Sequence, residues 1–142
     1  MIFHILDTDH VSLFQRKHPI IIKRLKENHS ENLAITIITV EEQIKGRFKL
    51  IKQANSSAKL IRAYATFQSS VAYFNTITVL AFDEAANVHY ENLRQQKIRI
   101  GTQDLRIASI VLSREDILVT RNRRDFDKIP NLTMEDWSIL TL

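Results

Sequence analysis

The sequence has no cysteine, so disulfides and thiolate metal sites are excluded and any metal must take oxygen or imidazole ligands. It has only two glycines and two prolines, which favours long helices over a turn-rich β-sandwich. No apolar run approaches the roughly 20 residues of a membrane span. The first residues lack the basic region and cleavage site of a signal peptide, and a glycine-rich phosphate loop is missing. We therefore expect a cytoplasmic protein with no membrane partner, and not an ATPase or a dinucleotide enzyme.

The composition is that of an ordinary globular protein. Of the 142 residues, 44% are hydrophobic and 25% are charged, and we expect one domain over residues 1–142. The formal net charge is +4 and the pI is near 9.5. This basic balance suits a polyanionic partner, although many basic proteins have none.

Strand and helix patterns alternate along the chain. Short apolar runs predict strands over residues 2–6, 33–38, 76–82, 117–119 and 132–140, the last containing Trp137. Amphipathic patterns predict helices over residues 9–14, 19–28, 39–53, 58–75, 83–96 and 102–112. Asp9 and Thr102 are the expected N-caps of the first and last of these helices. This alternation predicts an α/β fold, in three α/β/α layers with a mainly parallel central sheet.

Four acidic residues occupy corresponding places in this pattern. Asp7 follows the first strand, Glu42 lies in the helix after the second, Asp104 opens a later helix, and Asp125 follows the strand over 117–119. Helix starts and strand ends on one edge of a parallel sheet face the same crevice, where ligands bind. Several carboxylates without imidazole or thiolate suit Mg²⁺ or Mn²⁺ rather than Zn²⁺.

Each acid also has a purely structural interpretation. Asp7 could cap the first helix, and Glu42 could form a capping box with Thr39. Asp104 could complement the helix dipole, and Asp125 could be an Asx-turn residue. Convergence on one crevice favours the metal-site interpretation.

The basic residues also allow two interpretations. Between Lys45 and Arg62 lie six basic residues and no acid. They form either a solvated helix face or a surface that contacts phosphates, and the candidates on the first helix of this stretch are Lys45, Arg47, Lys49 and Lys52. Arg121, Arg123 and Arg124 could hold a scissile phosphate or merely offset the carboxylates. The five histidines, at positions 4, 10, 18, 29 and 89, show no paired ligand spacing, and we interpret them as surface or core residues.

Together these segments make the chain resemble a PIN-domain ribonuclease of the VapC toxin type. The resemblance spans essentially the whole chain and is carried by LDTD at 6–9, TVEEQIKG at 39–46, GTQDLRIAS at 101–109 and TRNRRDFDKIPNL at 120–132. It implies a PIN-like fold, a Mg²⁺-dependent endoribonuclease, inhibition by a cognate antitoxin, and a homodimer.

Carried over by position, the resemblance makes Asp7 and Asp104 primary metal ligands. Glu42 and Asp125 complete the acidic cluster, and the polar supports are Thr8, Thr39 and Asn122. Two positions depart from the family pattern. Asp9 stands where the family more often has Asn, which adds negative charge near the site, and Gln43 stands where it usually has Leu.

Two other functions remain open from the residues alone. A catalytically silent RNA- or protein-binding module could keep the acids as caps, although retention of all four argues against it. A phosphoacceptor receiver domain also clusters acids at strand ends. That interpretation requires a lysine closing the last loop of the site, where this chain offers arginines.

Overall fold

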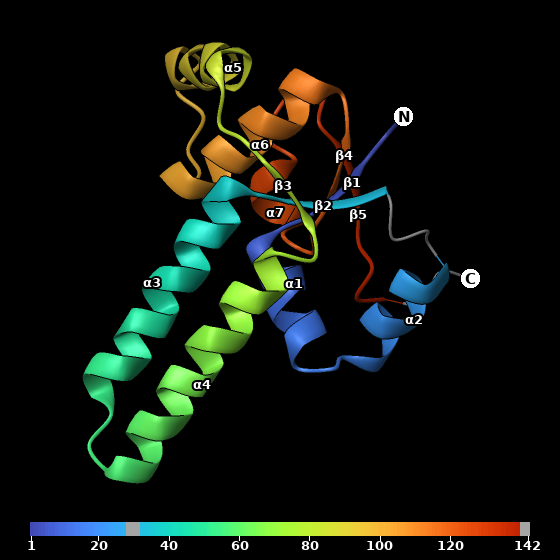
Figure 1. The fold of residues 1–142 in the computed structure, drawn as a ribbon. Coiled ribbons are helices and arrows are strands. Elements are labelled where there is room, and N and C mark those ends of the chain that lie inside the picture. Colours follow the sequence, from blue (N-terminus) through green and yellow to red (C-terminus); the bar gives the residue numbers. More distant parts are fainter. Residues whose placement is uncertain (28–31, 140–142) are drawn as a thin grey trace.

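Five parallel strands form the centre of the computed structural model, which describes residues 1–27 and 32–139 (Figure 1). They are β1 (His4–Leu6), β2 (Leu33–Thr36), β3 (Thr78–Leu80), β4 (Ile117–Val119) and β5 (Thr133–Glu135). Their order in the sheet is β3-β2-β1-β4-β5, so the sheet grows from β1 in both directions. The carboxyl ends of β1 and β4 therefore lie beside the point where strand order reverses, which is where open α/β sheets bind ligands.

Helices cover both faces of this sheet. They are α1 (Thr8–Gln15), α2 (Pro19–Glu27), α3 (Ile37–Gln53), α4 (Ser57–Phe74), α5 (Glu84–Gln95), α6 (Thr102–Arg114) and α7 (Arg123–Phe126). Successive residues of a strand point to opposite faces, so Ile5 packs in one hydrophobic cluster and Leu6 in the other. The first cluster is formed with α5 and α6, and the second with α1, α2 and the buried Trp137. The three-layer fold with a parallel sheet is thus confirmed.

Helix α6 is the most deeply buried helix beside the sheet. Ile107, Ala108, Ile110 and Val111 are almost completely buried. The helix ends at Glu115, whose left-handed backbone (φ 57°) lets its N–H donate to the Leu112 carbonyl. Strand β4 begins two residues later, so the core packing of α6 also fixes the position of β4.

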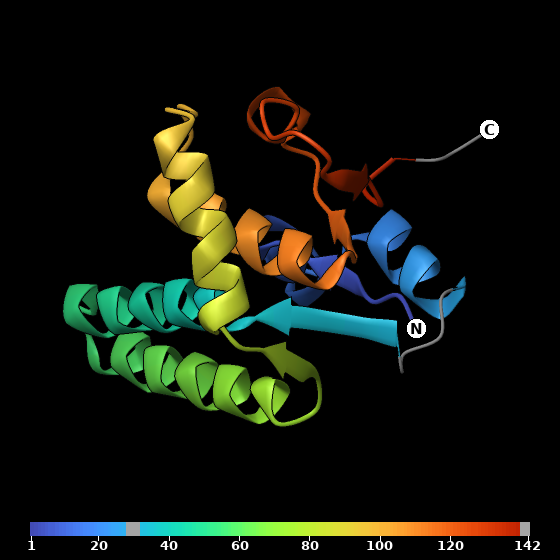
Figure 2. The same cartoon turned by 90° about the horizontal axis from the view of Figure 1, so that it is seen from above.

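Helices α3 and α4 lie side by side and project away from the sheet, as both views show (Figures 1 and 2). The Phe48 and Phe67 rings meet edge-to-face with centroids 5.3 Å apart. Both helices carry large apolar side chains that are exposed, and the most exposed of them is Ile61 at 70%. The pair is held to the rest of the protein mainly at the sheet end.

Several predicted boundaries differ from the structure. Asp7, not Asp9, is the N-cap of α1, and Gly101, not Thr102, is the N-cap of α6. The last strand covers only Thr133–Glu135, so Trp137 lies beyond it in the core, while residue 140 is outside the described range. Residues 28 and 29, the expected end of the second helix and one of the histidines, also lie outside the described range. None of the helices in residues 1–27 and 32–139 combines the length and apolarity that a bilayer crossing needs.

Candidate metal centre

The four predicted acids all lie at the carboxyl edge of the sheet. Asp7 directly follows β1, and Glu42 lies in the second turn of α3, which follows β2. Asp104 is in the first turn of α6, and Asp125 lies in the one-turn helix α7 after β4. Four elements separated along the chain thus bring one acid each to the same edge (Figure 1).

The pKa of Asp104 depends on its burial and on the other three carboxylates. Burial, together with the negative charges of Glu42, Asp7 and Asp125, raises the pKa of Asp104 from 3.8 to about 6. All four acids therefore share one electrostatic environment. No three of the four place carboxylate oxygens within 4.8 Å of one another. A Mg²⁺ site does not require three carboxylates in such close contact, because this ion is commonly bound through one or two carboxylates and several waters.

Asp7 is fixed by the helix it caps and by a histidine. Its Oδ1 accepts the His10 backbone N–H at 2.8 Å and lies 3.2 Å from His10 Nδ1. The fully buried His10 ring accepts the Trp137 backbone N–H at Nε2, at 3.3 Å. An imidazole that accepts at Nε2 carries its proton on Nδ1, so His10 donates to Asp7 and orients its carboxylate. The interpretation of His10 as a plain core or surface residue missed this contact.

Glu42 is held by two threonines. Thr8 Oγ1 donates to Glu42 Oε1 at 2.7 Å and lies 3.0 Å from Thr39 Oγ1. The single Thr8 hydroxyl hydrogen goes to the carboxylate, so the Thr39 hydroxyl donates to Thr8. The capping-box interpretation of Glu42 is wrong, because α3 begins at Ile37 and Thr36 supplies the cap by accepting the Thr39 N–H. Glu42 is thereby left to face the crevice.

Asp125 has its own polar support. Asn122 Nδ2 donates to Asp125 Oδ2 at 3.1 Å, and the Asn122 backbone N–H donates to Thr120 Oγ1 at 3.0 Å. The Lys128 ammonium lies 3.9 Å from Asp125. Asp125 therefore lies in a short helix that is itself fixed to the end of β4, rather than in an Asx turn.

The extra acid Asp9 is paired with arginine. Arg121 Nε and Nη2 donate to the two Asp9 oxygens at 2.6 and 3.2 Å. Asp7, Asp9 and His10 place potential ligand atoms within 4.8 Å of one another. Both His10 nitrogens are already hydrogen-bonded within the protein, so this group offers a cation oxygen ligands only.

The predicted basic surface divides between two sides of α3. Lys45, Lys49 and Lys52 surround a groove of about 550 Å³ whose floor includes Phe48 and Tyr64. Arg47 instead turns toward α1 and α4, where it donates to Gln15 and Ser70. Arg124 is exposed on α7. Arg121 is committed to Asp9, so its contact offsets a carboxylate, as one of the two interpretations of these arginines proposed.

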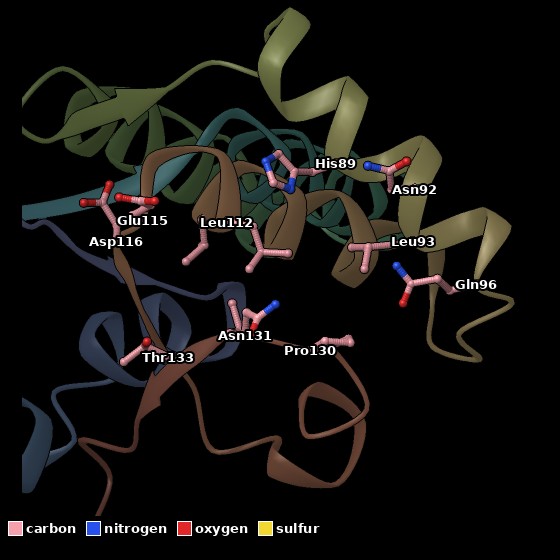
Figure 3. Close-up of a pocket in the computed structure, with 12 residues that line it drawn as sticks. His89, Asn92, Leu93, Gln96, Leu112, Glu115, Asp116, Pro130, Asn131 and Thr133 are labelled. Atoms are coloured by element: carbon pink, nitrogen blue, oxygen red, sulfur yellow. The ribbon is translucent and has the colours of Figure 1, made fainter.

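A separate cavity of about 450 Å³ lies at the opposite edge of the sheet (Figure 3). His89 and Asn92 of α5 and its C-cap residue Gln96 line one wall, and Thr133 of β5 and the preceding Asn131 line another. Asp116, which precedes β4, closes one end and accepts the Phe3 backbone N–H at 2.9 Å. None of the predicted site residues lines this cavity.

Fold and site together define a PIN-like α/β/α protein with carboxylates gathered at the switch point of a parallel sheet. Ribonuclease VapC1 of Haemophilus influenzae is 30% identical over 139 residues, covering 95% of this chain and 98% of that protein. The tRNA(fMet)-specific endonuclease VapC of Salmonella typhimurium is 27% identical over 141 residues, covering 96% and 99%. No protein-family model matches the chain.

Solved structures agree with these relatives. A chain of DNA-bound VapBC from Salmonella typhimurium superposes with a TM-score of 0.77 at 27% identity, covering 96% of this chain and 99% of that one. VapBC-1 from nontypeable Haemophilus influenzae gives a TM-score of 0.76 at 28% identity, covering 98% and 100%. The chain belongs to the VapC ribonuclease family.

Proposed function

We propose that this protein is a Mg²⁺-dependent endoribonuclease, the toxin of a toxin–antitoxin pair. The observation that carries the proposal is the convergence of four carboxylates beside β1 and β4, which appears as the raised pKa of Asp104. Membership of the VapC family supports RNA as the substrate. The neighbouring structures are VapBC complexes, which supports an antitoxin as partner. The homodimer expected from the resemblance stays a prediction.

Asp7 and Asp104 are the proposed direct metal ligands, with Glu42 and Asp125 completing the set. The donors are all oxygen, which fits Mg²⁺ and also Mn²⁺. A bound Mg²⁺ would act as a Lewis acid on the phosphodiester and lower the pKa of its water. Excess negative charge at Asp104 is the electrostatic condition that a divalent cation relieves.

The neighbouring residues keep these carboxylates in place. His10 orients Asp7, Thr8 and Thr39 orient Glu42, and Asn122 orients Asp125. Each contact restricts the rotation of the carboxylate, which is how outer hydrogen bonds orient the ligands of metal sites. We propose that Glu42 and Asp125 also bind or orient the attacking water.

The RNA strand is proposed to run along the cationic side of α3. Lys45, Lys49 and Lys52 are exposed there around three aromatic side chains, and Arg124 adds positive charge at α7. Lysines neutralise phosphates without reading sequence, whereas aromatic faces stack on unpaired bases. Such a surface suits single-stranded RNA.

The test is incubation of purified protein with total RNA and with a synthetic single-stranded RNA, in Mg²⁺, in Mn²⁺ and in EDTA. We expect internal cuts with either cation, none in EDTA, and none with Asp104→Asn. Cleavage that persists in excess EDTA would contradict the metal mechanism. RNA binding without any cleavage, under conditions where Mg²⁺ stabilises the protein, would favour the catalytically silent binding module.

A further inference from the structure

Arg47 is a partly buried cation with only neutral partners. Its Nε donates to Ser70 Oγ at 2.8 Å and its Nη2 to Gln15 Oε1 at 2.9 Å. No carboxylate oxygen of residues 1–27 and 32–139 lies within 4.0 Å of this guanidinium. Burial lowers the pKa of Arg47, and no opposite charge offsets that effect. A desolvated charge without a counter-ion is unfavourable, so this arrangement calls for an anion.

Arg47 borders a pocket of about 440 Å³ between α1, α3 and α4. A second guanidinium, Arg62, and the side chains of Thr66 and Ser69 line the same pocket from one face of α4. A guanidinium has five N–H donors, of which Arg47 uses two within the protein. The remaining donors and the exposed Arg62 offer the forked geometry that binds phosphate.

The charge around the pocket has one sign. From Gln43 to Phe82 the sequence contains six basic residues and no acidic residue. The pocket is also linked to the acidic crevice by a polar contact between α1 and α3, in which Gln43 bonds to Ser12 and Gln15. Thr39, which contacts Thr8 beside Glu42, lies two turns before Arg47 on α3, about 12 Å along the helix axis.

We infer that the pocket between α1, α3 and α4 binds a phosphate group, held by Arg47 and Arg62 and completed by the hydroxyl of Ser69. The Thr66 and Ser70 hydroxyls already donate to the Arg62 and Thr66 carbonyls. The phosphate comes either from the RNA strand or from a free phosphate ligand. The site itself is argued from its own residues, and only the assignment of the phosphate to RNA rests on the proposed function.

The first experiment measures thermal melting of metal-free protein in EDTA with added inorganic phosphate at constant ionic strength. Phosphate at ten times its dissociation constant should raise the melting temperature of the parent by roughly 5 °C. Arg62→Gln should abolish this shift, because the exposed Arg62 contributes to the pocket without holding the fold together. Arg47→Lys keeps the charge, loses the fork and should weaken the shift. Lys23→Gln, which removes one positive charge from α2, should show the same phosphate-induced shift in melting temperature as the parent.

The second experiment measures binding of a short single-stranded RNA in EDTA over a range of salt. If the strand supplies the phosphate, Arg62→Gln should reduce the slope of log K against log salt by about 0.7, and Lys23→Gln should not. An unchanged slope together with phosphate-dependent stabilisation would identify a free phosphate as the ligand.

Either proposal can fail without the other. Phosphate stabilisation in a protein that never cuts RNA would leave this site standing and remove the proposed function. The inference is overturned if phosphate stabilises no more than acetate at the same ionic strength and Arg62→Gln leaves the RNA slope unchanged. It is also overturned, in favour of a carboxylate-bearing protein partner, if acetate and phosphate protect equally and Arg62→Gln removes both effects.

Discussion

His10 links the first and last parts of the chain at the level of single atoms. Its Nδ1 serves Asp7, three residues earlier, and its Nε2 serves the backbone of Trp137, 127 residues later. One buried ring therefore fixes both the orientation of a proposed metal ligand and the path of the chain after β5. In the sequence, the only indication of the His10–Asp7 contact is the three-residue spacing, which places both residues within one helical turn. Nothing in the local sequence indicates the contact with Trp137.

Two substitutions separate these roles of His10. His10→Asn keeps an N–H donor close to Asp7 but is too short to accept the Trp137 backbone N–H. His10→Leu removes both hydrogen bonds. We expect each variant to lose about 1–3 kcal/mol of stability from the unsatisfied Trp137 N–H, and His10→Asn to keep more cleavage activity than His10→Leu. Activities are compared per folded molecule, with melts measured in parallel. Equal activity in the two variants would show that His10 supports the fold without positioning Asp7.

The Thr8 hydroxyl offers a second test at this scale. Thr8→Val keeps the side-chain shape and removes the 2.7 Å hydrogen bond to Glu42. Contacts of this kind around metal ligands are worth about 10–100-fold in metal affinity or activity, so the Mg²⁺ concentration for half-maximal cleavage should rise by that order. Thr133→Val, an exposed position at the start of β5, is the matched control. A Mg²⁺ requirement equal to that of the parent would remove Thr8 from the support of the site.

At the scale of elements, the sequence predicts the long helices and the buried strands best. Strand β4 lies where the apolar run predicts it, and α5 lies within one residue of the helix predicted over 83–96, with Asp83 as its N-cap. The errors have local physical causes. Thr36 and Thr39 are both plausible caps, and the buried strand–helix junction selects the first. Trp137 continues an apolar, β-like pattern, yet it packs into the core after the strand has ended.

The two sides of α3 could not be separated from sequence alone. In the sequence, the basic residue Arg47 cannot be distinguished from its neighbours Lys45, Lys49 and Lys52. Only packing against α4 and α1 decides which of these side chains are exposed. The exposed Lys49 and Lys52 allow a test of the proposed RNA path. Lys49→Ala with Lys52→Ala should lower the salt slope of RNA binding by about 1.4 in total, at about 0.7 per contact with a single strand. Lys23→Ala with Lys26→Ala on α2 is the matched control. If both pairs of substitutions have the same effect, Lys49 and Lys52 belong to a solvated helix face and do not contact RNA.

At the scale of the whole molecule, the fold separates charge. Topology alone brings Asp7, Glu42, Asp104 and Asp125 to one edge, which is why the strand ends and helix starts of a parallel sheet were enough to predict that they lie at the same edge. Of the 20 Lys and Arg residues, six lie on the projecting α3–α4 pair, where no acid follows Glu42. Negative charge is therefore concentrated at the carboxyl edge of the sheet, and the projecting part of the helix pair carries positive charge. Such an arrangement attracts a polyanion to the surface while keeping a cation-binding centre beside it.

The burial of Asp104 and the carboxylates around it should make the stability of the metal-free protein sensitive to pH. The pKa of this acid is raised in the folded state from 3.8 to about 6, so its stabilising contribution is fully present below about pH 4 and is lost as the pH rises through 6. Above pH 6 the ionised carboxylate opposes folding. A shift of this size corresponds to about 3 kcal/mol, and solvent screening of a half-buried group reduces it to the order of 1 kcal/mol.

Asp104→Asn removes the charge and keeps the shape, so in EDTA the variant should melt above the parent at pH 7 and close to it at pH 4. Mg²⁺ should stabilise the parent by mass action and the variant much less, while cleavage is lost. Thermal melts of both proteins at the two pH values, with EDTA and with Mg²⁺, measure all of these effects. If the variant melts lower than the parent in EDTA at pH 7, Asp104 acts mainly as a favourable charge at the α6 N-terminus, and its assignment as a metal ligand fails.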